Sequence, residues 1–351
     1  MKKYNRNIDV IIPAYNVPDE ILFRCLASIA CQDIANELEV TIVDDASTEQ
    51  NYSQVAKNFN SMLKINILRY EENGGPGVAR QYGLDNTSNG YVTFIDADDT
   101  FNGAFALKAL RNSIEVNDPL FQVSVGAFDE VHEEGLKPGD GPILLPHERD
   151  LVWMFGKLYR RSFIDKYNIR FHPTSRANED NGFNTLCRLY SNDREQINFI
   201  PVHVYYWHES PNSITRANDC QYSYGSSKRD SFYGYVENMV YAITETKKKM
   251  PYNSNIVMWA ISCMVHIYSY YIECCTRVPE HAETNFKWCK IYYDEVFKDI
   301  RKSMPQDVFA AQFNESMRNT YMGNRFAGIV PHITIYEFFD KLENYKVEEG
   351  N

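Results

Sequence analysis

The chain has 351 residues, of which 44% are hydrophobic and 24% are charged, and its formal net charge is −11 at pH 7. This composition excludes a disordered or collagen-like protein, and the length suffices for two domains or one large domain. The negative charge argues against a protein that holds nucleic acid through a broad basic surface.

The first hundred residues alternate between β-branched segments and helical patterns. Apolar residues at helical spacing predict a helix over 21–29, Ser47-x-x-Gln50 predicts a capped helix start, and residues 78–84 predict a third helix. The expected strands are residues 8–12, 40–43, 65–68 and 91–95, with apolar residues on both faces. This order predicts a doubly wound α/β sheet, whose ligands bind outside the carboxyl ends of the strands.

The pattern changes farther along the chain. Residues 129–150 are acidic and rich in Pro and Gly, which predicts a loop or hairpin. A helix is expected after Asp180, followed by a strand pair at 197–200 and 202–207. The later helices are expected at residues 256–275, 286–300 and 333–345. We therefore expect a first domain over residues 1–215 and an α-helical domain over 216–351.

Cysteine usage and the apolar segments bear on location. The eight cysteines form no Cys-x-x-Cys pair, which favours reduced thiols in a cytoplasmic protein. The first residues lead directly into a strand-like segment, so we expect no signal peptide. Residues 256–272 are shorter than the ~20 residues of a membrane span and contain His266, so a buried helix is favoured.

Three carboxylates follow the fourth predicted strand. Residues 96–99 read Asp-Ala-Asp-Asp, and such a cluster at the end of a buried strand is repulsive unless a cation neutralises it. Mg²⁺ and Mn²⁺ bind one or two carboxylates and complete their coordination with water and substrate phosphates. The alternative is a solvated acidic turn. The sequence favours a divalent cation at this strand end.

A glycine-rich segment precedes the third predicted helix and admits a competing interpretation. Residues 75–80 read Gly-Pro-Gly-Val-Ala-Arg, with Asp96 about twenty residues later, which imitates a dinucleotide-binding fingerprint. Arg80 stands where that fingerprint has its third glycine, and Asp98 and Asp99 add charge that a ribose pocket does not need. No Gly-Lys-Ser/Thr follows, which excludes a Walker phosphate loop.

Together these segments resemble the glycosyltransferases of family 2, which have a GT-A fold, a doubly wound, Rossmann-like nucleotide-sugar domain. The matching pieces are residues 11–16, 43–47, 73–80, 96–99, 156–163, 178–180 and 212–215. They span about residues 8–215, whereas residues 216–351 match nothing that we can name. The resemblance implies a metal-dependent, inverting transfer of a sugar from a nucleotide sugar, by family habit a UDP-sugar, to an acceptor hydroxyl.

The resemblance assigns donor-binding roles to several strand ends. Asp45, and with it Asp44, would bind the uracil edge beside Pro13 and Tyr15. Arg80 lies in a helix whose positive end would face the diphosphate, which helix electrostatics also favours. Two further cations, Lys157 and Arg160, would add charge there, although a surface strand explains them equally well.

The resemblance also implies metal ligands and a base. Asp98 would bind Mn²⁺ or Mg²⁺, with Asp96 at the ribose or the metal and Asp99 as an alternative ligand. His208 would complete the metal shell or meet the diphosphate; a structural role is the alternative. Asp180 would be the general base that takes the proton of the acceptor hydroxyl, because direct displacement needs one. The alternative is that Asp180 and its neighbour only complement a helix dipole.

The acceptor, the transferred sugar and the oligomeric state stay open. A glycan or a lipid-linked saccharide is the common acceptor class in such enzymes. A hydroxylated base in DNA is the alternative, with which Lys247, Lys248, Lys249 and the many tyrosines are compatible. A protein of another class, a nucleotide-sugar-binding module without turnover, would be expected to lack Asp98 or Asp180, and both are present.

Overall fold

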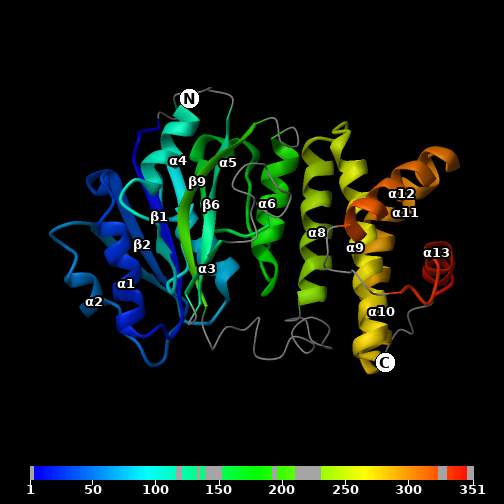
Figure 1. The fold of residues 1–351 in the computed structure, drawn as a ribbon, viewed down its shortest axis with the longest axis horizontal. Helices are drawn as coiled ribbons and strands as arrows, with labels where there is room; N and C mark the ends of the chain where they lie inside the picture. Colours follow the sequence, from blue (N-terminus) through cyan, green and yellow to red (C-terminus); the bar gives the residue numbers. More distant parts are fainter. Residues whose placement is uncertain are drawn as a thin grey trace. The chain divides into compact units, whose positions relative to one another are not determined.

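The computed structural model describes residues 4–115, 121–132, 135–138, 152–191, 196–209, 231–322 and 330–345 (Figure 1). Internal contacts divide the chain into two units. The first, an α/β unit, comprises Met1–Thr174 and Glu179–Ser213, and the second, a helical unit, comprises Ser175–Asn178 and Ile214–Asn351. The expected domain limit at residue 215 falls outside the described residues and stays a prediction.

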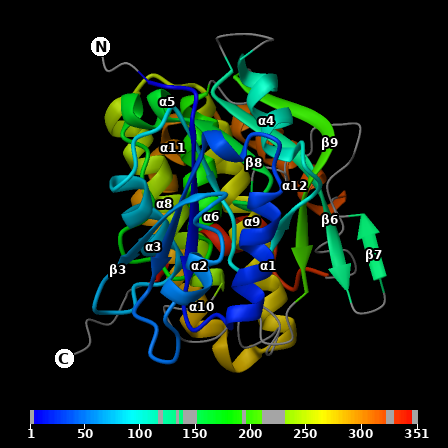
Figure 2. The same ribbon diagram turned by 90° about the vertical axis from the view of Figure 1, so that its left-hand side faces the viewer.

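The described strands of the α/β unit form one sheet in the order β3-β2-β1-β4-β8-β6-β9-β5. Strand β7 pairs with β6, and Figure 2 shows the two side by side. The strands are β1 (Ile8–Ala14), β2 (Leu38–Asp44), β3 (Lys64–Arg69), β4 (Tyr91–Phe94), β5 (Thr100–Phe101), β6 (Val123–His132), β7 (Gly135–Pro138), β8 (Lys157–Arg160) and β9 (Ile197–His208). Strands β1 to β4 run parallel, and β8 is antiparallel to both β4 and β6. Because β9 is parallel to β6, the carboxyl ends of β1, β2, β4 and β9 lie at one edge of the sheet.

Helices cover both faces of the parallel strands, as the apolar strands predicted. Alternation along β1 places Ile8, Val10 and Ile12 in one core with α1, while Ile11 faces α3 on the other side (Figure 1). At Gly83 a side chain would come within 2.6 Å of Ile11, so the glycine lets α3 approach the sheet. The helices of this unit are α1 (Asp19–Ala30), α2 (Ser53–Lys57), α3 (Pro76–Asp85), α4 (Ala106–Glu115), α5 (Arg161–Tyr167) and α6 (Glu179–Tyr190).

Three local predictions differ from the structure. Strand β3 is an edge strand with most of its residues exposed, so the expectation that both its faces are covered is wrong. The predicted strand pair is the single strand β9, whose register against β6 shifts after Gly126. Pro201 has no N–H for the ladder, and this interruption inside one strand imitates a turn in the sequence.

The third difference concerns Ser47, which caps no helix. Helix α2 begins at Ser53, and Tyr52 precedes it without a side-chain cap. The Ser47 hydroxyl instead accepts a hydrogen bond from the backbone N–H of Asn16 and lies 3.0 Å from the Tyr52 hydroxyl. The capping pattern predicts a local role for Ser47, but its hydroxyl bonds to Asn16, 31 residues earlier in the chain.

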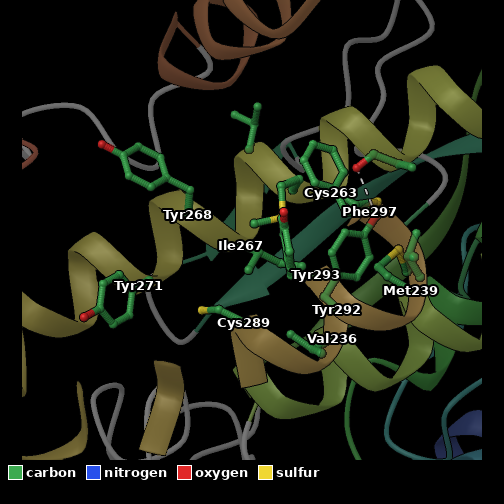
Figure 3. Packing of buried hydrophobic residues seen from close by; sticks show 14 of the residues in the cluster. Val236, Met239, Cys263, Ile267, Tyr268, Tyr271, Cys289, Tyr292, Tyr293 and Phe297 are labelled. Atoms are coloured by element: carbon green, nitrogen blue, oxygen red, sulfur yellow. Dashed lines mark hydrogen bonds between the residues drawn. The ribbon is translucent and has the colours of Figure 1, made fainter. Parts of the chain in front are cut away.

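The helical unit confirms the predicted later helices and adds others. They are α8 (Ser231–Lys249), α9 (Asn255–Arg277), α10 (Ala282–Tyr292), α11 (Lys298–Ser303), α12 (Gln306–Met322) and α13 (Ile335–Asn344), with a π-helical turn at Tyr293–Phe297 between α10 and α11. Aromatic side chains pack with aliphatic and sulfur-containing side chains in their common core (Figure 3). Residues 256–272 belong to α9, and most of them are buried. Within the described part of the chain, no helix combines the length and apolarity of a membrane span.

Candidate active site

The loops after β1 and β2 are tied together at the carboxyl edge of the sheet. Asn16 and Ala46 both have positive φ angles, of 48° and 61°. The backbone N–H of Asn16 donates to the Ser47 hydroxyl at 2.9 Å, and the Asn16 side chain accepts from the N–H of Thr48 at 2.8 Å. Tyr15, predicted to lie beside a nucleotide base, is 49% exposed between these loops, whereas Pro13 is half-buried in β1.

Asp44 and Asp45 follow β2 and are both buried. Asp44 accepts a hydrogen bond from the N–H of Ser47 and pairs with Arg69. The Asp45 carboxylate accepts from the N–H groups of Gly74 and Gly75, at 2.7 and 2.8 Å, and from the Asn73 amide at 3.0 Å. These bonds hold the loop that leads into α3, a structural task that the sequence did not suggest. The predicted contact of Asp45 with a base stays a prediction.

Helix α3 begins after Gly75, whose φ of 87° favours glycine. Arg80, one turn into the helix, is 4% exposed. Its Nη1 lies 2.7 Å from the Glu179 carboxylate and its Nη2 lies 2.6 Å from the Asp96 carboxylate. Burial lowers the pKa of Arg80, but Asp96, Glu179 and Asp180 together raise it above its ordinary value. The guanidinium is thus engaged by protein carboxylates, which leaves its predicted contact with a diphosphate unsupported.

The acidic turn after β4 contains three carboxylates in different surroundings. Asp96 is partly exposed and bound to Arg80. Asp99 is 1% exposed, and its oxygens accept from the Tyr205 hydroxyl and the backbone N–H of His208, both at 2.8 Å. Asp98 has no side-chain donor among the described residues; burial and the neighbouring Asp96 raise its pKa to about 6.

These surroundings discriminate between the candidate metal ligands. Each oxygen of Asp99 already accepts a hydrogen bond, whereas no described side chain donates to Asp98, so Asp98 would be the better ligand of the two. Burial, with Arg24 nearby, lowers the pKa of His208 to about 4, and its Nε2 lies 2.9 Å from the Thr100 hydroxyl. A neutral imidazole and a carboxylate are ligands that suit Mn²⁺.

The described residues would supply part of a cation's ligands and leave the others to water and substrate. They contain no group of three or more His, Cys, Asp or Glu side chains arranged to enclose a metal. A cation bound by Asp98 and His208 would take its other ligands from water and a diphosphate, as Mg²⁺ commonly does. Such a cation would also relieve the repulsion that raises the pKa of Asp98.

Asp180 lies in the first turn of α6, next to Glu179. Burial and the Glu179 charge raise its pKa to about 7, although Arg80 opposes the shift. Its Oδ1 accepts from the N–H of Asn181 at 2.7 Å. A helix N-terminus favours the ionised form of an acidic side chain, but burial outweighs that effect here. A carboxylate with a pKa near neutrality is suited to accept a proton.

Lys157 and Arg160, which were expected to add positive charge near the diphosphate, are not exposed cations at the carboxyl edge of the sheet. Lys157 is 2% exposed, and its Nζ donates to the carbonyl of Phe155 at 3.2 Å. Arg160 pairs with Tyr91 at the amino end of β4, opposite the acidic turn, and donates to the carbonyl of Phe121. The interpretation of Arg160 as a diphosphate contact therefore lacks support.

Two contributors escaped the sequence analysis. Tyr205 donates to Asp99 and accepts from the N–H of Asp96 at 3.3 Å, so it supports the acidic turn from β9. Arg24 of α1 donates to the carbonyl of Asp98. Neither lies in a motif. A tyrosine inside an apolar strand and an arginine on an amphipathic helix both resemble ordinary core and surface residues.

Comparison with known proteins decides the family. The model of "Glycosyl transferase family 2" matches residues 9–177. This part of the chain is a glycosyltransferase family 2 domain. The match contains the predicted donor residues and the acidic turn, whereas Asp180 and His208 lie beyond it. Residues 96–99 thus belong to the family 2 domain that the sequence motifs indicated.

Two curated relatives are also glycosyltransferases by name. The chain is 41% identical over 123 residues to "Glycosyltransferase GlyA" of Streptococcus pneumoniae, covering 35% of this chain and 17% of that one. It is 27% identical over 203 residues to the poly(ribitol-phosphate) beta-N-acetylglucosaminyltransferase TarS of Staphylococcus aureus, covering 56% and 35%. The chain thus spans little more than a third, or less, of these two relatives.

A solved structure shows the fold. The crystal structure of S. aureus TarS 1-349 in complex with UDP-GlcNAc matches with a TM-score of 0.65 at 19% identity, over 91% of both chains. The GT-A fold predicted for the family 2 domain is thereby confirmed, together with a helical C-terminal region.

Proposed function

We propose that this protein is a metal-dependent, inverting glycosyltransferase that moves a sugar from a UDP-sugar to an acceptor hydroxyl. One observation carries the proposal: Arg80 joins Asp96 of the acidic turn to Glu179, the neighbour of Asp180, and so brings a candidate metal ligand and a candidate base together in the α/β unit. Asp98 supplies the former and Asp180 the latter. Inverting transfer needs one group to stabilise the leaving diphosphate and another to accept a proton.

On the donor side, Asp98 and His208 would hold Mn²⁺ or Mg²⁺. When bound, the cation supplies positive charge that stabilises the departing diphosphate. Asp96 is held by Arg80 and stays partly exposed, which suits a hydrogen bond to the ribose. Tyr15, half-exposed beside Pro13, would stack on or border the base, and Asp45 would bind its edge with the lone pairs that the glycine loop leaves.

On the acceptor side, Asp180 removes the proton of the attacking hydroxyl. With a pKa of about 7, a large fraction of this carboxylate is ionised at neutral pH while it still binds a proton effectively. Attack from the side opposite the diphosphate inverts the anomeric carbon. The acceptor hydroxyl must therefore lie next to Asp180 on the face away from the metal.

The relatives support the choice of donor and acceptor class. TarS carries the name of a beta-N-acetylglucosaminyltransferase that acts on poly(ribitol-phosphate), and its structure was solved with UDP-GlcNAc. We propose UDP-GlcNAc as the first donor to test, and a glycan or another polymer with free hydroxyls as the acceptor.

A DNA acceptor remains the competing proposal, and the basic run in α8 favours it little. The Lys248 ammonium lies 2.7 Å from the Glu245 carboxylate, and Lys247 donates to the carbonyl of Val296 at 3.4 Å. These contacts suit cations at a helix C-terminus. Duplex binding that falls steeply with salt would support DNA, and no binding at two ionic strengths would remove it.

The test of the proposed function measures donor binding. Calorimetric titration with UDP, GDP and UDP-GlcNAc, each with Mn²⁺ and with excess chelator, should show uridine-nucleotide binding that needs the metal. Asp98→Asn should abolish the metal effect, while Asp33→Asn, which removes only the partner of Lys108 on the surface, should not. Equal UDP affinity in excess chelator would contradict the proposal.

Release of UDP from UDP-GlcNAc separates an enzyme from a binding module. An enzyme of this kind should transfer the sugar slowly to water even without its natural acceptor. Wild-type protein that binds UDP-GlcNAc with Mn²⁺ but releases no UDP over a day, with or without added polyols, would favour the module.

A further inference from the structure

Arg80 joins two acidic segments that are far apart in the sequence. It extends from α3 to Asp96 at the end of β4 and to Glu179 in the first turn of α6, at 2.6 and 2.7 Å. The side chain of Arg80 is 5% exposed and that of Glu179 is 9% exposed, so this ion pair is largely withdrawn from water. Asp96 belongs to the proposed donor side and Glu179 precedes the proposed base.

The buried position of Arg80 calls for a reason beyond stability. Its Nε is buried and has no hydrogen-bond partner among the described residues, and desolvation of a guanidinium is unfavourable. Buried ion pairs are frequently no more stabilising than apolar residues of the same size. An arginine enclosed in this way, with both terminal nitrogens on carboxylates, is also poorly placed to bind a diphosphate directly.

We propose that Arg80 is a positioning residue that fixes the first turn of α6 against the acidic turn and keeps Asp180 able to accept a proton. The proposal rests on the proposed function only in treating Asp180 as the base. Its structural part, the link between Asp96 and Glu179, stands independently.

The charges around Asp180 show why a cation is needed there. Glu179 on the same helix, Asp96 after β4 and the Tyr159 phenol of β8 interact electrostatically with this carboxylate, and Arg80 is the cation that lowers its pKa. The Tyr159 hydroxyl donates to Asn184 at 2.7 Å. Without Arg80, burial and the negative neighbours would be opposed chiefly by the hydrogen bond from the backbone N–H of Asn181, and Asp180 would hold its proton to a higher pH.

The decisive experiment titrates Asp180 directly, without donor, metal or acceptor. In protein labelled with ¹³C, the Asp180 carboxyl signal is identified by its loss in Asp180→Asn. Arg80→Met should move its titration midpoint upward by about one to three pH units. Glu179→Gln should move it downward, because a negative neighbour is removed, and Arg80→Lys should stay nearer the wild type. Arg170→Met is the matched control, since Arg170 pairs with Asp85 on the surface.

A second variant covers the case in which Arg80→Met does not fold, since it leaves Glu179 buried without its cation. The double variant Arg80→Met/Glu179→Gln has no such charge, and its midpoint should lie above that of Glu179→Gln alone. A midpoint that Arg80→Met leaves unchanged in folded protein, or that is equal in the double variant and in Glu179→Gln, would overturn the inference.

Turnover tells the inference apart from the proposed function. In UDP release from UDP-GlcNAc with Mn²⁺, the acid limb of the pH–rate profile should shift upward in Arg80→Met by the amount seen in the titration. A purely structural role of Arg80 predicts an equal loss at every pH. If Asp180→Asn turns over like the wild type, the assignment of the base fails while the titration result for Arg80 stands.

Discussion

The two units bury different kinds of side chain. In the described part of the helical unit, Glu273 is the one buried charged side chain, and it pairs with Arg277 of its own helix. The other buried residues of this unit are apolar, aromatic or uncharged polar, and Tyr292, for example, donates its hydroxyl to the carbonyl of Ala260. In the α/β unit, by contrast, carboxylates and guanidinium groups are buried both at the carboxyl edge of the sheet and elsewhere in the unit.

The contrast shows that the α/β unit buries more charged groups than the described part of the helical unit does. Buried charge is unfavourable unless it is paired, and the α/β unit pairs it over long sequence separations, as in Arg80 with Glu179 and Arg161 with Asp9. The described part of the helical unit buries few charges and has a core rich in aromatic side chains. Of these two pairs, Arg80 with Glu179 lies beside the candidate site, whereas Arg161 with Asp9 lies at the amino end of β1.

The largest expected effect on stability is in the aromatic core. Phe339 of α13 is fully buried, with ring centroids 5.5 Å from Phe297 and 5.8 Å from Phe313. Phe339→Ala should lower the free energy of unfolding by about 3–5 kcal/mol, measured by urea denaturation of the transition that includes α13. Tyr336→Ala, on the same helix but 53% exposed, is the control and should cost far less. Equal losses would refute the description of this core.

A buried charge pair of the α/β unit should be nearly as sensitive. Arg161→Met leaves Asp9, 1% exposed, without its cation and should cost about 3 kcal/mol. Burial already raises the pKa of Asp9. Ionised Asp9 without Arg161 therefore destabilises the folded protein more as the pH rises. The loss should therefore be larger at pH 8 than at pH 4. The double variant Asp9→Asn/Arg161→Met should recover part of it, and a loss independent of pH would contradict this account.

Asp45→Ala should have a smaller effect, on both stability and binding. The N–H groups of Gly74 and Gly75 lose their acceptor, which should cost about 1–3 kcal/mol of stability. If Asp45 also binds the uracil edge, UDP affinity should fall more than GDP affinity in the same titration. Equal loss of both nucleotides would leave Asp45 with its structural role alone.

The smallest effect expected is a gain. The pKa of Asp180 is raised by burial to about 7, so its ionised form is disfavoured in the folded protein and costs stability once the pH exceeds its ordinary value. Asp180→Asn should therefore melt about 2–4 °C higher than the wild type at pH 8. The gain should vanish near pH 4, where Asp180 is protonated. A helix-capping role predicts a lower melting temperature instead.

Periodicity and motif order were enough to predict the GT-A sheet, most helices and the acidic turn. The pattern failed where a residue acts at long range: Ser47 resembles a helix cap but ties two loops, and Pro201 resembles a turn but lies within β9. In both cases the neighbouring sequence predicts one local structure, whereas the fold places the residue in a different one.

The site was predicted less completely than the fold. Motifs identify residue types at strand ends, but they do not tell which partner satisfies each charge. The sequence therefore placed Arg80 on a diphosphate, whereas the structure places it between Asp96 and Glu179. Tyr205 has no motif at all, because its contact with Asp99 depends on the register of β9.

The central claim is that Asp180 acts on the acceptor hydroxyl and leaves donor binding to the strand ends. One preparation of Asp180→Asn tests it when UDP affinity with Mn²⁺ and turnover of UDP-GlcNAc are measured together. The account predicts near wild-type UDP affinity with turnover lowered about 10²–10⁴-fold, the usual contribution of a general base. Turnover near the wild-type value in folded, UDP-binding protein would contradict it.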